Sequence, residues 1–319
     1  MERKLVVTEP NQRLDVFLSA NIEGLSRKKA REACEGGRVS VNGKAGRAGT
    51  ALQAGDEIVF LDTGDAAAKP EMGLPIHVHL RTESYLVVEK PRGIPTVRLR
   101  PDDPVTLADC VAALDSRCLT ASPDSREAGL VQRLDYWTSG LVLAAVNRRA
   151  WEFFHDALMS GRIRKSYLAL VEGEVKRSAY TVGTPLRQSK DGKRMERAEV
   201  GDAPETSFSA QTRVEVLLSA QFAGKKASIV RAFGDRVRRH QIRAHLAFSG
   251  HPLVGDELYG AKSRLADVIP EEDGFLLHAD WLEVTDLQTG ELVSVQSASE
   301  LLQGLAASTG LSFSAKPSI

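Results

Sequence analysis

The spacing of apolar and polar positions divides the chain into a short N-terminal unit and a longer remainder. In RLDVFLSAN, apolar side chains recur at Leu14, Phe17 and Leu18, which predicts an amphipathic helix. A second helix is expected to begin at Ser26, a favourable N-cap, and to end at the Gly-Gly pair after RKKAREACE. RVSVNGK alternates before an Asn-Gly turn, and GDEIVF is typical of a further strand.

Beyond this unit, TGDAAAKPEMG is small and polar and indicates a linker. The apolar runs in YLVVEKPRG, GLVLAAV and SYLALVEGEV predict buried strands, whereas RRAWEFFHDALMSG and RRHQIRAHLAFSG predict helices. Because strands and helices mix without a regular alternation, we expect an α+β fold with a mixed, largely antiparallel sheet and flanking helices. The predicted division is an N-terminal domain at 1–62, a linker at 63–74, a larger domain at 75–300 and a C-terminal helix and tail at 301–319.

The composition narrows the classes of protein. The 319 residues are 42% hydrophobic and 26% charged, and no apolar run approaches the roughly 18 residues of a membrane span. MERKLVVTEP lacks the apolar core of a secretory signal, so a cytoplasmic location is expected. Three scattered cysteines, seven scattered histidines and the lack of a phosphate-binding glycine motif lead us to expect no metal, no nucleotide cofactor and no disulfide framework.

Charge is balanced overall but uneven along the chain, with 42 basic and 42 acidic residues. The segment from Arg27 to Arg47 contains seven basic and two acidic residues, and the segment from Arg231 to Arg243 contains five arginines and one aspartate. A third basic cluster runs from Arg187 to Arg197. Such patches on a neutral protein are typical of a polyanion bound at defined places, although each cluster alone could be a solvated loop.

The four residues QRLD occur twice, in different surroundings. In the first copy Asp15 lies in the first helical turn, where the helix dipole favours a carboxylate, and its spacing from Arg13 suggests a surface ion contact. In the second copy Asp135 precedes a Thr-Ser-Gly bend and six apolar residues. A carboxylate there must be paired or hydrogen-bonded, so a structural cap and a reactive group are both open on these grounds.

The order RLDVFL, LSRKKA, GGRVSVNGK and GD.I over residues 12–60 resembles the S4-type RNA-binding domain. The resemblance implies a helix pair and a short β element that present one basic face to folded RNA. Phosphate contacts of this kind supply affinity and positioning without reading sequence. The residues that the resemblance places in this role are Arg27, Lys28, Arg31, Arg38 and Lys44.

The second copy, RLDYWTSGLVL, resembles the central motif of the RluA-like pseudouridine synthases, whose pattern is HRLD, two variable residues and TSGLLL. Four more segments match in order: YLVVEKPRGIP, RKSYLALVEGEV, RVRRHQIRAHLAFSGHPLVGDELYG and FLLHADWLEV. Together they span about residues 84–285. The resemblance implies an RNA uridine isomerase that detaches uracil from C1′ of ribose and reattaches it through C5 without a cofactor.

By this resemblance Asp135 is the catalytic carboxylate, which either attacks C1′ or assists glycosidic cleavage and ribose deprotonation. Tyr167 matches the tyrosine that lies against uracil and takes the C5 proton, and Arg243 matches the basic partner that keeps the carboxylate ionised. The sequence departs from the family pattern at Gln132, at Tyr136 and Trp137, and at Val237. The remaining residues expected to bind substrate or RNA are Arg133, Thr138, Arg238, His240 and Gln241.

Two other readings predict different behaviour. A non-catalytic RNA-binding or assembly protein that kept the fold would bind RNA without forming product. A glycoside hydrolase would need two carboxylates flanking one bond, and only Asp135 stands in such a setting. We therefore expect a monomeric enzyme with RNA as its partner; the S4-like segment favours ribosomal RNA, and transfer RNA remains open.

Overall fold

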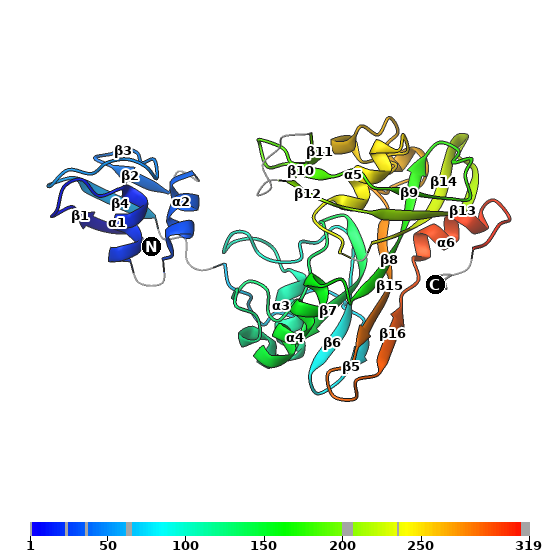
Figure 1. Cartoon of the computed structure of the whole chain (residues 1–319), viewed down its shortest axis with the longest axis horizontal. Coiled ribbons are helices and arrows are strands. Elements are labelled where there is room, and N and C mark those ends of the chain that lie inside the picture. The colour runs from blue at the N-terminus through cyan, green and yellow to red at the C-terminus, as the bar shows by residue number, and fades with distance from the viewer. Residues whose placement is uncertain are drawn as a thin grey trace. The chain divides into compact units, whose positions relative to one another are not determined.

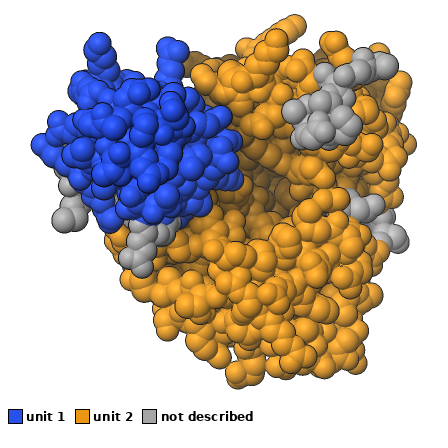
Figure 2. Space-filling view, turned by 60° about the vertical axis from the view of Figure 1, so that its left-hand side comes forward, with its two compact units in different colours: residues 1–66, 100–102 blue, residues 67–99, 103–319 orange. Residues whose placement is uncertain are grey.

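The computed structural model describes residues 2–22, 25–35, 38–61, 66–199, 207–234 and 236–313. Two compact units divide the chain, one formed by Met1–Ala66 with Arg100–Asp102 and the other by Ala67–Leu99 with Asp103–Ile319 (Figure 2). Over the described ranges, none of the helices has the length and apolar character needed to cross a membrane.

The first unit contains two helices and the antiparallel sheet β1–β4–β2–β3 (Figure 1). Both predicted helices are confirmed, and the Ser26 hydroxyl accepts a hydrogen bond from the Lys29 amide at 3.2 Å as an N-cap does. The glycine pair expected to end the second helix lies outside the described residues. Asn42 and Gly43 have φ of 51° and 75°, the positive values that a tight hairpin requires. The elements are β1 (Glu2–Val6), α1 (Leu14–Asn21), α2 (Arg27–Glu35), β2 (Val39–Val41), β3 (Lys44–Ala45) and β4 (Glu57–Leu61).

The ion contact expected at the surface in the first QRLD copy is buried instead. The Asp15 carboxylate is fully buried and lies 3.0 Å from Arg13, 3.1 Å from Arg27 and 2.8 Å from Arg31. Burial favours the neutral acid, but hydrogen bonds from the three arginines outweigh it and hold the pKa of Asp15 well below its usual range. Asp15 therefore ties α1 to α2, and the first copy is part of the scaffold.

The second unit is built on a sheet with the strand order β5–β6–β7–β15–β8–β14–β13–β9, with β16 also pairing β15. In the described part of this sheet the pair β7–β15 is parallel and the other pairs are antiparallel, which confirms the predicted α+β fold and mixed sheet. The strands are β5 (Val78–Arg81), β6 (Tyr85–Lys90), β7 (Thr138–Ala145), β8 (Arg164–Glu172), β9 (Ala179–Val182), β13 (Thr212–Phe222), β14 (Lys225–Phe233), β15 (Leu277–Thr285) and β16 (Leu292–Gln296).

Helices and a small separate sheet, β11–β10–β12, accompany the large sheet (Figure 1). The last helix packs on β8, and three of its residues join the core there. The elements are α3 (Leu107–Leu114), η1 (Ser116–Thr120), α4 (Arg148–Met159), β10 (Leu186–Gln188), β11 (Met195–Arg197), β12 (Ser207–Phe208), α5 (Gln241–Phe248), η2 (Glu257–Tyr259), η3 (Leu265–Asp267) and α6 (Glu300–Ala307).

The central strands are continuously apolar because both faces of the sheet are covered. In β7, Val142 packs into the cluster that contains α3, whereas Leu141 and Leu143 pack with Phe154 of α4. Each strand residue therefore finds apolar neighbours whichever way it points. The runs in the sequence predicted this burial.

The parallel pairing of β7 with β15 depends on a glycine. Gly140 has φ +108°, and a Cβ added there would lie 2.3 Å from the carbonyl oxygen of Ala279. Ala279 is in turn opposite Tyr167 on β8. The close approach thus places the start of β7, and the loop before it, two strands away from Tyr167.

Candidate active site

Lys90, the last residue of β6, holds the loop that carries Asp135 through hydrogen bonds to its backbone. The fully buried Lys90 ammonium donates hydrogen bonds to the carbonyls of Pro91, Tyr136 and Thr138 at 2.9, 3.1 and 2.8 Å. Burial lowers the pKa of Lys90 to about 7, an effect that the negative charge of Asp135 opposes. Two of its acceptors, in Tyr136 and Thr138, follow closely after Asp135, so Lys90 fixes the backbone next to the carboxylate.

Arg243, on α5, joins two carboxylates. Its Nη1 donates to Oδ2 of Asp135 at 2.8 Å, while Nε and Nη2 donate to both oxygens of Asp256 at 2.7 and 2.8 Å. The side chains of Arg243 and Asp256 are 7% and 2% exposed, whereas that of Asp135 is 26% exposed. Burial alone would lower the pKa of Arg243, but the hydrogen bonds and charges of both carboxylates raise it. Asp135 is therefore the member of this group that a substrate can reach.

Two aromatic rings enclose the guanidinium of Arg243. Its Cζ lies 4.4 Å from the ring centroid of Phe275 and 5.1 Å from that of Tyr259. These cation–π contacts shield the Arg243 guanidinium from water and so strengthen its attraction for Asp135.

His240 precedes α5 in the left-handed conformation, with φ 55°. Its Nε2 lies 3.6 Å from Oδ2 of Asp135, and its Nδ1 lies 3.2 Å from the hydroxyl of Tyr259. Burial and the nearby Arg243 lower the pKa of His240 to about 4, although Asp135 acts in the opposite direction. The imidazole is therefore neutral at pH 7. Because the Tyr259 hydroxyl accepts from the Met195 amide at 2.8 Å, it can donate to Nδ1 and leave the ring proton on Nε2, facing Asp135.

Tyr167 stands on the same sheet face as Lys165, two residues earlier on β8. Both side chains are 5% exposed. Burial and the charge of Asp135 raise the pKa of Tyr167, so it is a phenol at neutral pH. Burial also lowers the pKa of Lys165 to about 8. Tyr167 is therefore a neutral group near Asp135, whereas Lys165 is still largely protonated at pH 7.

The other residues that the sequence placed at the site differ in exposure. Arg133 and Arg238 are exposed. Thr138 and Gln241 are each 2% exposed. The Gln241 amide donates to the Gln211 carbonyl and to Thr212, and accepts from the Arg238 amide. Gln241 therefore braces the turn before α5 rather than facing solvent.

The basic cluster between Arg231 and Arg243 is not uniformly a surface feature. Arg231 is 1% exposed and forms an ion pair of 3.0 Å with Asp280 in the interior. Arg243 is buried in the active site, as described above. In the first unit Lys28 and Lys44 are exposed and Arg38 is partly buried, while Arg27 and Arg31 are half-exposed and engage Asp15.

The two aromatic residues after Asp135 have different surroundings. Trp137 packs against Gly274, where an added Cβ would lie 2.3 Å from the indole, and the Arg92 guanidinium lies 5.3 Å from the ring centroid. Tyr136 is 50% exposed and meets Trp137 edge-on. Tyr136 is therefore open to solvent beside Asp135, whereas Trp137 packs the loop.

Unpartnered polar atoms gather around the same loop. Within the described ranges, the buried side-chain atoms without a hydrogen-bond partner are both amide atoms of Gln132, the Thr138 hydroxyl and Nε of Arg92. Gln132 and Thr138 flank Asp135 in sequence, and Arg92 lies against Trp137. Each such atom costs about 1–3 kcal/mol, a cost that folded proteins accept chiefly where function requires it.

Sequence reasoning missed Asp256, Tyr259 and Lys90. Asp256 and Tyr259 lie inside the matched segment GDELYG, and Lys90 ends the apolar run YLVVEK. A charged residue at the end of a buried strand was the available signal for Lys90. In the part of the chain that the structure describes, no three His, Cys, Asp or Glu side chains gather as metal ligands do. The chemistry available here is that of an oriented carboxylate beside a phenol and a neutral imidazole.

Comparisons with known proteins agree with this geometry. Residues 84–248 match the RNA pseudouridylate synthase family, and residues 12–58 match the S4 domain. The uncharacterized RNA pseudouridine synthase YlyB of Bacillus subtilis is 27% identical over 296 residues, which cover 91% of each chain. Ribosomal large subunit pseudouridine synthase C of Pasteurella multocida is 31% identical over 267 residues, 80% of this chain and 76% of the relative.

The structure of human RNA pseudouridylate synthase domain containing 1 superimposes with a TM-score of 0.56 at 27% identity, covering 74% of this chain and 89% of the human one. The family match spans more than half of the chain and includes Asp135, Tyr167 and Arg243. The chain therefore belongs to the RNA pseudouridylate synthase family, with an S4 domain ahead of the synthase segment.

Proposed function

We propose that this pseudouridine synthase acts on uridines of ribosomal RNA, with Asp135 as its catalytic carboxylate. The observation that carries the assignment of Asp135 is its hydrogen bond to Arg243, whose Nε and Nη2 donate to Asp256. Asp135 is the exposed end of this chain of charges. The S4 match and the relative from Pasteurella multocida, named for the large ribosomal subunit, support ribosomal RNA as the substrate.

The reaction is an isomerisation that needs no co-reactant. The N1–C1′ bond of uridine breaks, uracil turns, C5 forms a bond to C1′, the C5 proton leaves and N1 gains a proton. Asp135 either bonds to C1′ or stabilises the positive charge that develops on the ribose, and Arg243 orients it in both cases. Neither route changes the net proton count.

Tyr167 is assigned to holding the base. Because its raised pKa keeps it a phenol, it can pack against uracil and donate a hydrogen bond, but it cannot accept the C5 proton in this state. We assign removal of the C5 proton to the Asp135 carboxylate, which is free once the new C–C bond has formed and then passes the proton to water. A uridine in a helix must leave the stack to reach this carboxylate.

The test is a pseudouridine map of ribosomal and transfer RNA from a deletion strain that carries either the wild type or Asp135→Asn. We expect a ribosomal site that is lost on deletion, restored by the wild type and not restored by Asp135→Asn. Restoration by both proteins would refute the role of Asp135. A change confined to transfer RNA would refute the substrate, and RNA binding without any modified site would support a non-catalytic RNA-binding protein instead.

A further inference from the structure

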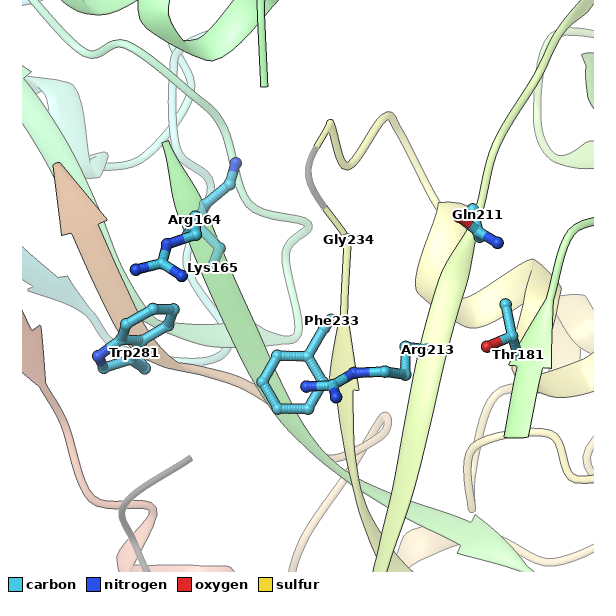
Figure 3. A pocket seen from close by; sticks show the side chains of 8 residues that line it. All are labelled: Arg164, Lys165, Thr181, Gln211, Arg213, Phe233, Gly234 and Trp281. Carbon is cyan, nitrogen blue, oxygen red and sulfur yellow. The ribbon is translucent and has the colours of Figure 1, made fainter. Parts of the chain in front are cut away.

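A pocket of about 320 Å³ opens in the second unit at the end of β8 where Arg164 begins the strand (Figure 3). Its lining includes two arginines, two aromatic rings, an amide and a hydroxyl. The lining also includes Gly234 and Lys165, a nearly buried lysine two residues before Tyr167; the other lining residues lie apart from the group around Asp135. The residues that matter for the argument are Arg164, Thr181, Gln211, Arg213, Phe233 and Trp281.

Each arginine lies over one of the aromatic rings. The Cζ of Arg164 is 5.7 Å from the ring centroid of Trp281, and that of Arg213 is 4.3 Å from the ring centroid of Phe233. The side chains of Arg164 and Arg213 remain 44% and 49% exposed. One face of each guanidinium is therefore supported by a ring, while much of the side chain is open to solvent.

The register of the strands separates the two arginine–aromatic pairs by a small residue. Ser166 on β8 is opposite Phe233 on one side and Trp281 on the other. Strands about 4.8 Å apart place these two positions about 10 Å from each other. Since stacked rings lie about 4.5–7 Å apart, this spacing admits one flat ring between the pairs.

Carboxylates offset the charge of both arginines, although the pocket also contains the ammonium of Lys165. Arg164 forms an ion pair with Glu283, and Arg213 forms one of 3.2 Å with Glu215. These carboxylates fix the guanidinium planes and offset their charge, so the attraction for a free anion is reduced. Gln211 and Thr181 are exposed at the pocket and offer the donors and acceptors that a base edge needs.

We propose that this pocket binds the base of an unpaired RNA nucleotide, stacked on the guanidinium planes of Arg164 and Arg213. Splayed bases of single-stranded RNA are commonly bound on such planes. The inference rests on the RNA substrate of the proposed function. It adds a second binding site, separate from the one that receives the target uridine.

The pocket is connected to the active site by two segments. Along β8, Arg164 is three residues, about 10 Å, from Tyr167, so the two side chains point to opposite faces of the sheet. Gly234, which also lines the pocket, begins the segment that leads to His240. One RNA strand can therefore occupy both sites only by passing the end of the sheet at which β8 begins.

The test compares two fluorescein-labelled probes, a 12-mer of adenylate and an abasic 12-mer with the same phosphates, on the full-length protein. The informative variant is Arg164→Lys with Arg213→Lys, because lysine keeps the charge and loses the plane. Arg117→Lys with Arg126→Lys is the matched control, since these arginines form similar exposed ion pairs with Asp115 and Asp124.

We expect the wild type to prefer the adenylate probe and the pocket variant to lose about fivefold to tenfold of that preference, with abasic binding within about twofold. The control variant keeps the preference. An equal loss for both probes would show a charge effect and overturn the proposal, as would an unchanged preference.

Two further measurements distinguish a free nucleotide from RNA as the ligand, and failure of the pocket proposal from failure of the proposed function. Binding of AMP alone, abolished in the pocket variant while the probe preference is unchanged, would assign the pocket to a free nucleotide and refute the RNA role. The Asp135→Asn protein should keep the probe preference, because the pocket does not use Asp135. If the wild type bound neither probe, the RNA-binding part of the proposed function would fail; if it bound both without a pocket effect, only the present inference would fail.

Discussion

The carboxylate of Asp256 takes two of the donors of Arg243, at 2.7 and 2.8 Å, and leaves Nη1 directed at Asp135. These three hydrogen bonds together fix the orientation of the Arg243 guanidinium. Because Asp256 is almost fully buried, it cannot itself touch RNA. We infer that Asp256 is a positioning residue that acts through Arg243.

Asp256→Asn should lower kcat about 10- to 100-fold with little change in KM, because a misplacement of about 1 Å at a reacting group has effects of this size. The substitution also removes a negative charge that balances the buried Arg243 guanidinium, which should reduce the free energy of unfolding by up to about 3 kcal/mol. Single-turnover rates at saturating RNA and urea unfolding measure the two effects.

The control for this prediction is Asp267→Asn, which alters a surface pair with Arg264 whose atoms lie 3.5 Å apart. Such exposed pairs contribute at most about 1 kcal/mol, so both rate and stability should stay near the wild type. Asp256 would be structural only if Asp256→Asn lost stability but had the wild-type kcat at temperatures well below the melting temperature of the variant.

His240 should make the protein less stable in acid. Its pKa in the folded protein is about 4, below its ordinary value of 6.5, so the unfolded chain takes up a proton first as the pH falls through this window. Folding stability should thus decrease by about 2 kcal/mol between pH 7 and pH 4.5 on account of His240. Urea unfolding of the wild type and of His240→Gln at both pH values isolates this contribution; an equal acid loss in both proteins would contradict it.

Local patterns in the sequence predicted much of the fold because helix and strand periodicity, caps and turns depend on neighbouring residues. Ser26 as an N-cap and the Asn42–Gly43 turn are examples that the structure confirms. The apolar run of β7 likewise predicted a strand covered on both faces. These features require no knowledge of distant contacts.

Charged residues were harder to place because their partners are distant in the sequence. Asp15 appeared as a surface contact of Arg13, yet Arg27 and Arg31 from the next helix bury it. Arg231 appeared in a basic patch, yet its partner Asp280 is 49 residues away. Family motifs linked Asp135 with Arg243, 108 residues apart, but gave no signal that Asp256 completes the pair.

Gln132→Leu should raise the free energy of unfolding by about 1 kcal/mol, because both amide atoms of Gln132 are buried without a partner. If this amide turns toward RNA in the complex, the same substitution should raise KM. Urea unfolding and steady-state kinetics measure the two effects. Gln132→Glu is the contrasting variant, since a buried charge in the same place should destabilise the protein. A loss of stability in Gln132→Leu would mean that the amide has a partner in solution.

Substitutions of Tyr136 and Trp137 should have different effects, the first on RNA binding and the second on stability. Tyr136→Ala removes a ring that is 50% exposed beside Asp135, so it should raise KM for RNA about fivefold or more and leave the melting temperature unchanged. Trp137→Ala removes the ring packed against Gly274 and should lower the free energy of unfolding by about 2–4 kcal/mol.

Tyr136→Phe is the control for Tyr136→Ala, because it keeps the stacking face and should keep KM. Thermal unfolding and RNA affinity, measured for all three variants, test the contrast. A lowered melting temperature in Tyr136→Ala with unchanged KM would place this ring in the scaffold as well.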